Sequence, residues 1–432
     1  MTSVLEKPVT PQAWPMGPAA PPLREAWLSV RRLWARARQP DVMTPLALAL
    51  AVRLVVLLVA TAVAVWYFAP RNPTAYAGFT FQDFWERKDA YWYLSIAELG
   101  YTYPAIVSAT PNFFPLFPML VAFFGAILRL LHVPEPYLIA GMAISWVTFA
   151  AALVVFYQLA LYKFHFNRRV ALGAVLLLSV FPFSFYDGAV YTESIYLICI
   201  AVAFLAVERR NWLLATAAAG IASATRPPGL ILGACVALAY TIVWLQDARR
   251  TGRWLRWDIL TLALIPVGYL CYLVYSWITF GDPLQYQKVS AAGWHAGLQL
   301  TSLRFTWNLL SDPNTWAIVH HPKAWLNTGY LLVTTEVAFV ALAALCLIAV
   351  PFAWRLLGAP YGLFLLLSIV APLVDFPDLN SLGRYLSVLF PAFFLAAYLL
   401  RDHPRMLYAL SGVSFVALCL YASYFIAGFG LS

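Results

Sequence analysis

The feature that most constrains this chain is a set of long apolar runs. Residues 46–69, 137–162, 258–280, 328–353 and 406–428 are mostly apolar, and each run is roughly 20 or more residues long. A helix of about 20 residues crosses a hydrocarbon core of about 30 Å. The alternation expected of membrane-spanning strands is absent from these runs, which disfavours a β-barrel. We therefore expect an all-α, polytopic bundle of transmembrane helices.

The composition agrees with a fold surrounded by lipid. Of 432 residues, 62% are hydrophobic and 11% are charged, whereas soluble domains are about 45–50% apolar and about 25% charged. All five cysteines lie within apolar stretches, so the sequence predicts neither a disulfide framework nor a metal site. We expect the lipid bilayer, and no nucleic acid, as a partner.

The first 42 residues differ from the rest of the chain because they are rich in proline and then in arginine. They predict a cytoplasmic tail, partly disordered. Within it, residues 23–38 interleave tryptophan with arginine and predict either an interfacial helix or the flank of the first span. The next apolar run is too long for a signal peptide. Residues 43–432 are expected to form a single transmembrane domain.

The placement of charge predicts the topology, because basic residues concentrate in cytoplasmic loops. Basic clusters at 163–169, 208–210, 247–256 and 401–405 are expected to share the cytoplasmic side with the N-terminus. The polar stretches 70–112 and 281–327 are then outer loops. About eleven spans (10–12) follow. Segment 113–131 is read as a re-entrant or interfacial helix, because Pro115 and Pro118 disrupt its first turn; counting it as a span gives twelve.

The first outer loop contains a candidate catalytic carboxylate. Residues 89–98 predict a short helix lying on the membrane, with Trp92, Ile96 and Leu99 at the interface and Gly100 as its stop. Asp89 falls at the start of this helix, where the helix dipole favours a negative charge. Asp89 is therefore either a helix cap or a catalytic group.

Two further outward-facing motifs carry aromatic and acidic residues. The chain re-enters the membrane through Phe114, Pro115 and Phe117, which predict either the wall of a sugar or lipid groove or interfacial anchors. Near the start of another span lies Glu193, and a carboxylate at that depth requires a partner or a polar substrate. Thr192, which precedes it, is the natural candidate for the N-cap.

Two arginines lie at the outer ends of spans. Arg226 is followed by two prolines, which fix its backbone, and Arg384 begins a later span end. A guanidinium group binds phosphate through two parallel hydrogen bonds. Each arginine is thus a candidate for phosphate binding, and the alternative for each is contact with lipid headgroups.

Together these motifs resemble the PIG-V-like mannosyltransferases, which are membrane glycosyltransferases of the GT-C type. The resemblance runs in order from Trp85 to Tyr385, and Lys88, Ala90 and Phe117 depart from the family pattern of Trp, Gly and Tyr. The matching residues are Asp89 with Trp92-Tyr93, Ile96-Ala97 and Gly100-Tyr101, then Phe113-Phe114-Pro115-Leu116-Phe117-Pro118, Phe181-Pro182, Tyr191-Thr192-Glu193-Ser194, Thr225-Arg226-Pro227, Gly229-Leu230 and Arg384-Tyr385.

The resemblance implies a GT-C-like fold and a reaction. A polyprenyl-phosphate hexose, expected to carry mannose, would donate its sugar with inversion to a glycolipid, polysaccharide or protein at the non-cytoplasmic face of a bacterial plasma membrane. Asp89 would be the base, Arg226 and Arg384 would hold the phosphate, and no metal or cofactor would be needed. The sugar and the acceptor would contact Glu193, Tyr191, Thr192, Trp92 and Tyr93, and the prenyl chain would lie along Phe114, Pro115 and Phe117.

A transporter or lipid flippase is the alternative class, because it too needs polar residues at membrane depth. The sequence shows no inverted repeat with paired broken helices. The polar motifs also gather on one predicted face, which favours the transferase.

Overall fold

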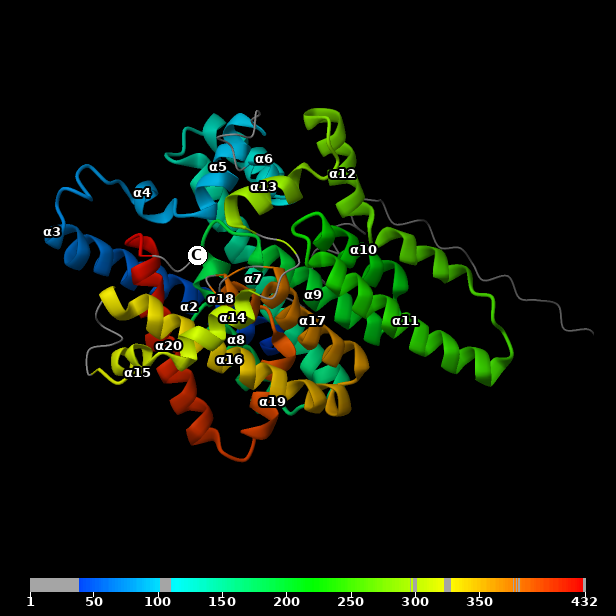
Figure 1. The fold of residues 1–432 in the computed structure, drawn as a ribbon. Helices are drawn as coiled ribbons and strands as arrows, with labels where there is room; N and C mark the ends of the chain where they lie inside the picture. The colour runs from blue at the N-terminus through cyan, green and yellow to red at the C-terminus, as the bar shows by residue number, and fades with distance from the viewer. Residues whose placement is uncertain are drawn as a thin grey trace, which may run out of the picture. The chain divides into compact units, whose positions relative to one another are not determined.

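The computed structural model describes residues 39–101, 110–295, 297, 301–321, 328–375, 377, 379 and 381–429. The regular structure of these residues is helical (Figure 1), which confirms the predicted all-α class. By its internal contacts the chain divides into two units, Met1–Met43 and Thr44–Ser432. The elements below belong to the second unit, except for the first residues of α2.

The helices follow one another along the chain with short connections. In order they are α2 (Pro40–Val63), η1 (Ala64–Phe68), α3 (Ala69–Arg71), α4 (Phe81–Trp85), α5 (Asp89–Leu99), η2 (Thr110–Asn112), α6 (Leu116–Leu130), α7 (Pro136–Lys163), α8 (Arg168–Ser179), η3 (Ser184–Gly188), α9 (Glu193–Glu208), α10 (Trp212–Ser223), α11 (Gly229–Thr251), η4 (Trp257–Leu264), α12 (Val267–Phe280), α13 (Gln285–Trp294), α14 (Thr301–Ser311), α15 (Pro313–Val319), α16 (Thr328–Leu356), α17 (Ala359–Asp375), α18 (Leu382–Ser387), α19 (Phe390–Leu399) and α20 (Pro404–Ile426).

Five helical stretches among the described residues are long and apolar enough to cross a membrane. They are Pro40–Arg71, Pro136–Lys163, Gly229–Thr251, Tyr330–Leu356 and Pro404–Ile426. Four of the five apolar runs predicted from the sequence coincide with these helices to within two residues at each overhanging end. Helices α6, α10, α17 and α19 are apolar but have only 10–17 residues, fewer than the roughly 20 of a full span. The expected number of about eleven crossings therefore stays a prediction.

The fifth predicted run, 258–280, is not one straight helix. It consists of η4 and α12, which meet at an angle of 44°. Pro266 lies at the break. Proline has no backbone N–H and interrupts the hydrogen bonding of a helix, which explains why a run of this length bends.

The core is a large cluster of apolar side chains around α7 and α9. Helix α7 packs against α6, α8 and α9, and α9 packs in turn against α10 and α11. Aromatic rings from distant helices meet within it: the ring centroids of Phe156 and Phe390 are 4.6 Å apart, and those of Phe204 and Tyr361 are also 4.6 Å apart. These contacts join α7 to α19 and α9 to α17, and the rings of Phe204 and Phe390, 5.1 Å apart, connect the two pairs of helices.

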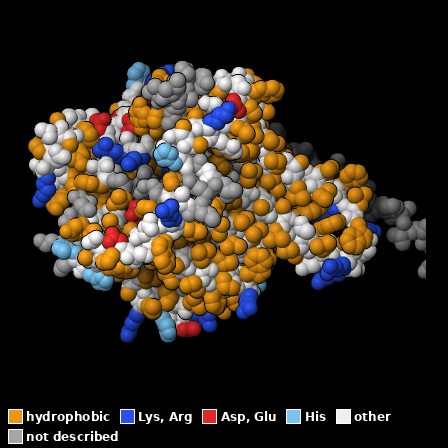
Figure 2. All heavy atoms as spheres, in the orientation of Figure 1, with side chains coloured by type: hydrophobic (Ala, Val, Ile, Leu, Met, Phe, Trp, Pro, Cys, Tyr) orange, Lys and Arg blue, Asp and Glu red, His pale blue; other side chains and the backbone are white. Residues whose placement is uncertain are grey.

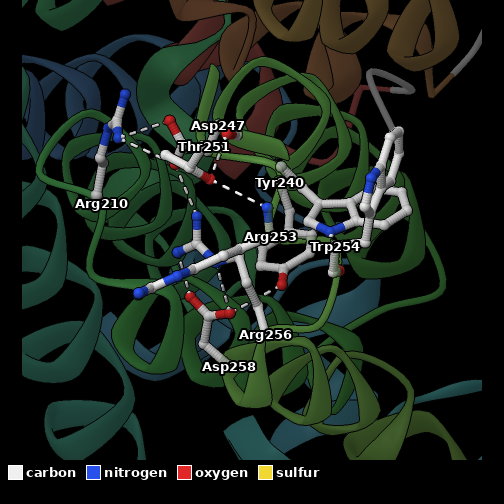
Figure 3. A network of polar contacts seen from close by, with 9 residues as sticks. Arg210, Tyr240, Asp247, Thr251, Arg253, Trp254, Arg256 and Asp258 are labelled. Carbon is white, nitrogen blue, oxygen red and sulfur yellow. Dashed lines mark hydrogen bonds and ion pairs between the residues drawn. The ribbon is translucent and has the colours of Figure 1, made fainter. Parts of the chain in front are cut away.

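Three basic clusters that were predicted to share one side of the membrane do lie together. Lys163 pairs with Glu208 at 2.8 Å, and Arg210 pairs with Asp247 at 3.3 Å. Figure 3 shows Asp247 between Arg210 and Arg256, while Arg256 and Tyr240 both reach Asp258. These pairs join the loops that follow α7, α9 and α11.

Both predicted outer loops contain helices. Helix α5 begins at Asp89, and Gly100, with a φ of 77°, ends it, as the sequence predicted. Its expected interfacial face is wrong in part, because Ile96 is buried in the core whereas Leu99 is exposed. The second loop, 281–327, contains α13, α14 and α15.

Candidate active site

Four charged residues from four separate segments form one connected cluster. The Nε of Arg384 donates to Oε1 of Glu193 at 2.7 Å, and Nη1 of Arg226 donates to the same oxygen at 2.9 Å. Nη1 of Arg384 also pairs with Oδ2 of Asp89. The structure thus brings together the acidic and basic residues that the sequence singled out, across as many as 295 positions in the chain.

Burial differs between the members of this cluster. The side chain of Glu193 is fully buried, those of Arg226 and Arg384 are 10% exposed, and that of Asp89 is 18% exposed. Asp89 is therefore the member most accessible to a molecule arriving from outside. Both guanidinium groups point toward carboxylates of the cluster.

Both carboxylates begin a helix. Asp89 is the first residue of α5 and Glu193 is the first residue of α9, so each lies where the helix dipole stabilises negative charge. Lys88, and not Asp89, occupies the N-cap position of α5, and no side chain caps that helix. The capping alternative for Asp89 is therefore wrong: its carboxylate pairs with Arg384.

The backbone that carries Arg226 is fixed by packing. Pro227 and Pro228 follow it, and the phenol of Tyr196 donates to the carbonyl of Pro228 at 2.8 Å. A Cβ added to Gly229 would lie 2.3 Å from the backbone of Ala222, so only glycine fits this position. The guanidinium of Arg226 consequently has a defined place beside Glu193.

Tyr191 holds the turn in front of Asp89. Its phenol oxygen accepts a hydrogen bond from the N–H of Asp89 and donates one to the carbonyl of Arg87, both at 3.3 Å. Between these residues Lys88 has a φ of 56° and a ψ of −120°, a conformation that costs a residue with a side chain about 1–3 kcal/mol. Burial raises the pKa of Tyr191 well above its usual value, so the phenol stays protonated and can make both bonds.

Aromatic rings line the inner side of the arginines. The guanidinium of Arg384 lies 4.8 Å from the ring centre of Tyr191 and 5.6 Å from that of Tyr186. Arg226 lies 5.1 Å from the ring centre of Tyr385. Ring faces attract guanidinium groups, so these contacts keep the positive charges in place without neutralising them.

The other residues predicted to bind sugar or acceptor lie next to the cluster. Thr192 occupies the N-cap position of α9, but its side chain makes no cap bond; its hydroxyl lies 3.5 Å from the phenol oxygen of Tyr93. Burial raises the pKa of Tyr93. Trp92 is half-buried and stacks on Phe113, with ring centroids 6.3 Å apart.

The aromatic–proline motif lies beneath this surface. Phe117 is fully buried and packs edge-on against Tyr93 at 5.1 Å, and Phe114 is 1% exposed and packs against Tyr272 at 4.6 Å. Neither ring is open to a ligand in this structure. Of the three residues proposed to line a prenyl groove, only Pro115 is half-buried.

The predicted site omitted two charged residues that lie behind it. Arg53, in the first spanning helix, is buried and donates to the carbonyls of Ser184 at 2.6 Å and of Ser179 at 3.2 Å. Asp187, in η3, is fully buried, and neither of its carboxylate oxygens accepts a hydrogen bond from the described residues. A charge inside a long apolar run is an available signal for Arg53.

No family model matches the chain, and no curated protein matches it. Among solved structures, ArnT from Cupriavidus metallidurans, bound to undecaprenyl phosphate, is similar. The two share 15% sequence identity over 89% of this chain and 76% of that one, with a TM-score of 0.42.

Proposed function

We propose that the protein is a membrane glycosyltransferase of the GT-C type. It transfers a hexose, proposed to be mannose, from a polyprenyl-phosphate donor to an acceptor hydroxyl at the non-cytoplasmic face, with inversion. The acceptor is a glycolipid, a polysaccharide or a protein. The observation that carries this proposal is that Arg226 and Arg384 share one oxygen of Glu193 while Arg384 also pairs with Asp89.

Phosphate binding is the role that suits the two arginines. Both guanidinium groups donate to the same oxygen of Glu193 and therefore lie close together in space. Planar guanidinium groups bind phosphate oxygens through paired N–H donors. The donor is a phosphodiester with one negative charge, and the departing prenyl phosphate gains a second negative charge. Two fixed positive charges in a largely buried site stabilise that developing charge.

The acceptor needs a base, and Asp89 is the most exposed carboxylate of the cluster. The acceptor oxygen forms a bond to the anomeric carbon, the bond from that carbon to the phosphate oxygen breaks, and the hydroxyl proton passes to Asp89. Protonation of Asp89 removes a negative charge from the cluster as the phosphate gains one. The total charge of site and substrate therefore stays constant during transfer.

Glu193 is proposed to position the arginines and to bind the sugar. Its Oε1 accepts from both guanidinium groups, whereas its Oε2 is buried and accepts no hydrogen bond from the described residues. A buried carboxylate oxygen without a donor is costly. A sugar hydroxyl that reaches Oε2 would supply the missing donor.

The experiment is a transfer assay with purified protein in liposomes that contain prenyl-phosphate mannose and candidate acceptors. Wild type should form product, Asp89→Asn should lose transfer by about 100-fold or more, and Glu98→Gln, an exposed carboxylate change on the same helix α5, should behave like wild type. Equal transfer by wild type and Asp89→Asn would remove Asp89 from the mechanism. Movement of the donor across the bilayer without sugar transfer would favour a flippase instead.

A further inference from the structure

A groove at the far end of α8 from the candidate site has the features of a lipid site. It has a volume of about 480 Å³, within the range of about 300–1,000 Å³ that is usual for ligand sites. Helices α2, α8, α19 and α20 form its walls, together with the α19–α20 connection. The lining residues used below are Leu48, Arg169, Leu172, Leu176, Arg401 and Leu407.

The groove combines an apolar wall with a positive rim. Leucines from α2, α8 and α20 supply the wall, and Arg169 and Arg401 are the charged residues of the lining. The starts of α8 and α20 add Arg168 and Arg405, and the α19–α20 connection adds His403 and one carboxylate, Asp402, all exposed. In Figure 2 basic side chains lie along the lower edge of the view, where Figure 1 shows the α19–α20 connection.

Three of these arginines lie at positions that a helix dipole disfavours for a cation. Arg168 and Arg169 lie in the first turn of α8, and Arg405 lies in the first turn of α20. The positive end of a helix dipole disfavours a cation there. Arg401 pairs with the largely exposed Asp402 at 3.4 Å, donates to the carbonyl of Tyr398 at 3.2 Å, and lies over the ring of that tyrosine at 4.2 Å from its centre. Segments 168–169 and 401–405 together hold four arginines and one aspartate, so the rim has a net positive charge.

We propose that this groove binds an anionic phospholipid of the cytoplasmic leaflet. The headgroup phosphate lies between Arg169 and Arg401, and an acyl chain follows the leucine wall. Basic pockets between membrane helices on the cytoplasmic side bind anionic headgroups by this chemistry.

The test measures which lipids stay bound to the purified full-length protein. Protein is reconstituted with equal amounts of phosphatidylglycerol and phosphatidylcholine, re-extracted, and examined by native mass spectrometry. Wild type should retain more phosphatidylglycerol than phosphatidylcholine. The double variant Arg169→Gln/Arg401→Gln should retain about tenfold less of it.

Two controls separate the groove from general charge and from misfolding. Arg249→Gln/Arg250→Gln removes two exposed arginines at the end of α11 and should leave retention unchanged. Leu176→Trp fills the apolar wall and should lower retention while both arginines remain. Equal phosphatidylglycerol on wild type and Arg169→Gln/Arg401→Gln would overturn the proposal. Displacement of the phospholipid by stoichiometric farnesyl phosphate would also overturn it, because it would assign the groove to the prenyl-phosphate carrier.

Discussion

The phenol of Tyr191 lies 3.3 Å from the backbone nitrogen of Asp89 and closes the turn from which that carboxylate projects. The same oxygen donates to the carbonyl of Arg87, so one side chain bridges the two ends of the turn. Its ring also lies beside the guanidinium of Arg384. Tyr191 therefore sets the position of both the proposed base and one proposed phosphate ligand.

Replacing Tyr191 by Phe should slow transfer about tenfold and leave the apparent affinity for donor nearly unchanged. The two lost hydrogen bonds contribute about 0.5–1.5 kcal/mol each, while the ring beside Arg384 remains. Steady-state kinetics with prenyl-phosphate mannose would show the effect in kcat. Tyr91→Phe, an exposed change on the same helix, is the control. A variant with unaltered kcat would show that the turn does not depend on the phenol.

Lys88→Gly should stabilise the protein by about 1 kcal/mol. Glycine adopts a φ of 56° without the steric cost that lysine bears, and part of this gain is offset by its greater freedom in the unfolded chain. Thermal unfolding in detergent would show a higher Tm. Ala97→Gly, within α5, should lower the Tm by comparison. A lower Tm for Lys88→Gly as well would contradict a strained turn.

Local patterns in the sequence were enough to predict several elements. Continuous apolar runs predicted most of the long helices, and Gly100 marked the end of α5 because a positive φ suits glycine. The bend within residues 258–280 could have been predicted from Pro266, but it was not. The predicted interfacial face of α5 was wrong in part, because a 3.6-residue repeat of apolar residues does not show which side meets lipid and which meets protein.

The pairing within the candidate site depends on tertiary structure. The sequence motifs indicated Asp89, Glu193, Arg226 and Arg384 one by one. Spacing along the chain does not show that Glu193 pairs with both arginines. The burial of Phe114 and Phe117 was also not predictable, because an aromatic–proline run looks the same at a lipid surface and under a site. Arg53 was detectable as a charge in an apolar run, whereas its contacts with Ser179 and Ser184 were not.

Asp187 should make stability depend on pH. Burial raises its pKa from 3.8 to about 8, against the opposing effect of Arg53. Between about pH 4 and pH 8 the unfolded chain releases this proton while the folded protein keeps it, so the free energy of unfolding falls as the pH rises. The loss is at most about 1.4 kcal/mol per pH unit.

Asp187→Asn removes the titrating group and keeps the shape. The Tm of the variant relative to wild type should therefore rise steadily from pH 5 to pH 8, measured in one detergent at constant ionic strength. Asp402→Asn, at a largely exposed site, should show no such trend. A constant difference in Tm across this range would mean that Asp187 is ionised in the folded protein.

The most direct measurement is the binding of farnesyl phosphate to Asp89→Asn, made alongside its transfer rate. In the proposed mechanism a phosphate would compete with Asp89 for the N–H group of Arg384 that now pairs with Asp89. Neutralising Asp89 should therefore leave phosphate affinity equal or increased while transfer is lost. Arg384→Gln should instead weaken binding by about tenfold or more. If Asp89→Asn lost phosphate binding together with transfer, or kept both, the account of Asp89 as base and Arg384 as phosphate ligand would be contradicted.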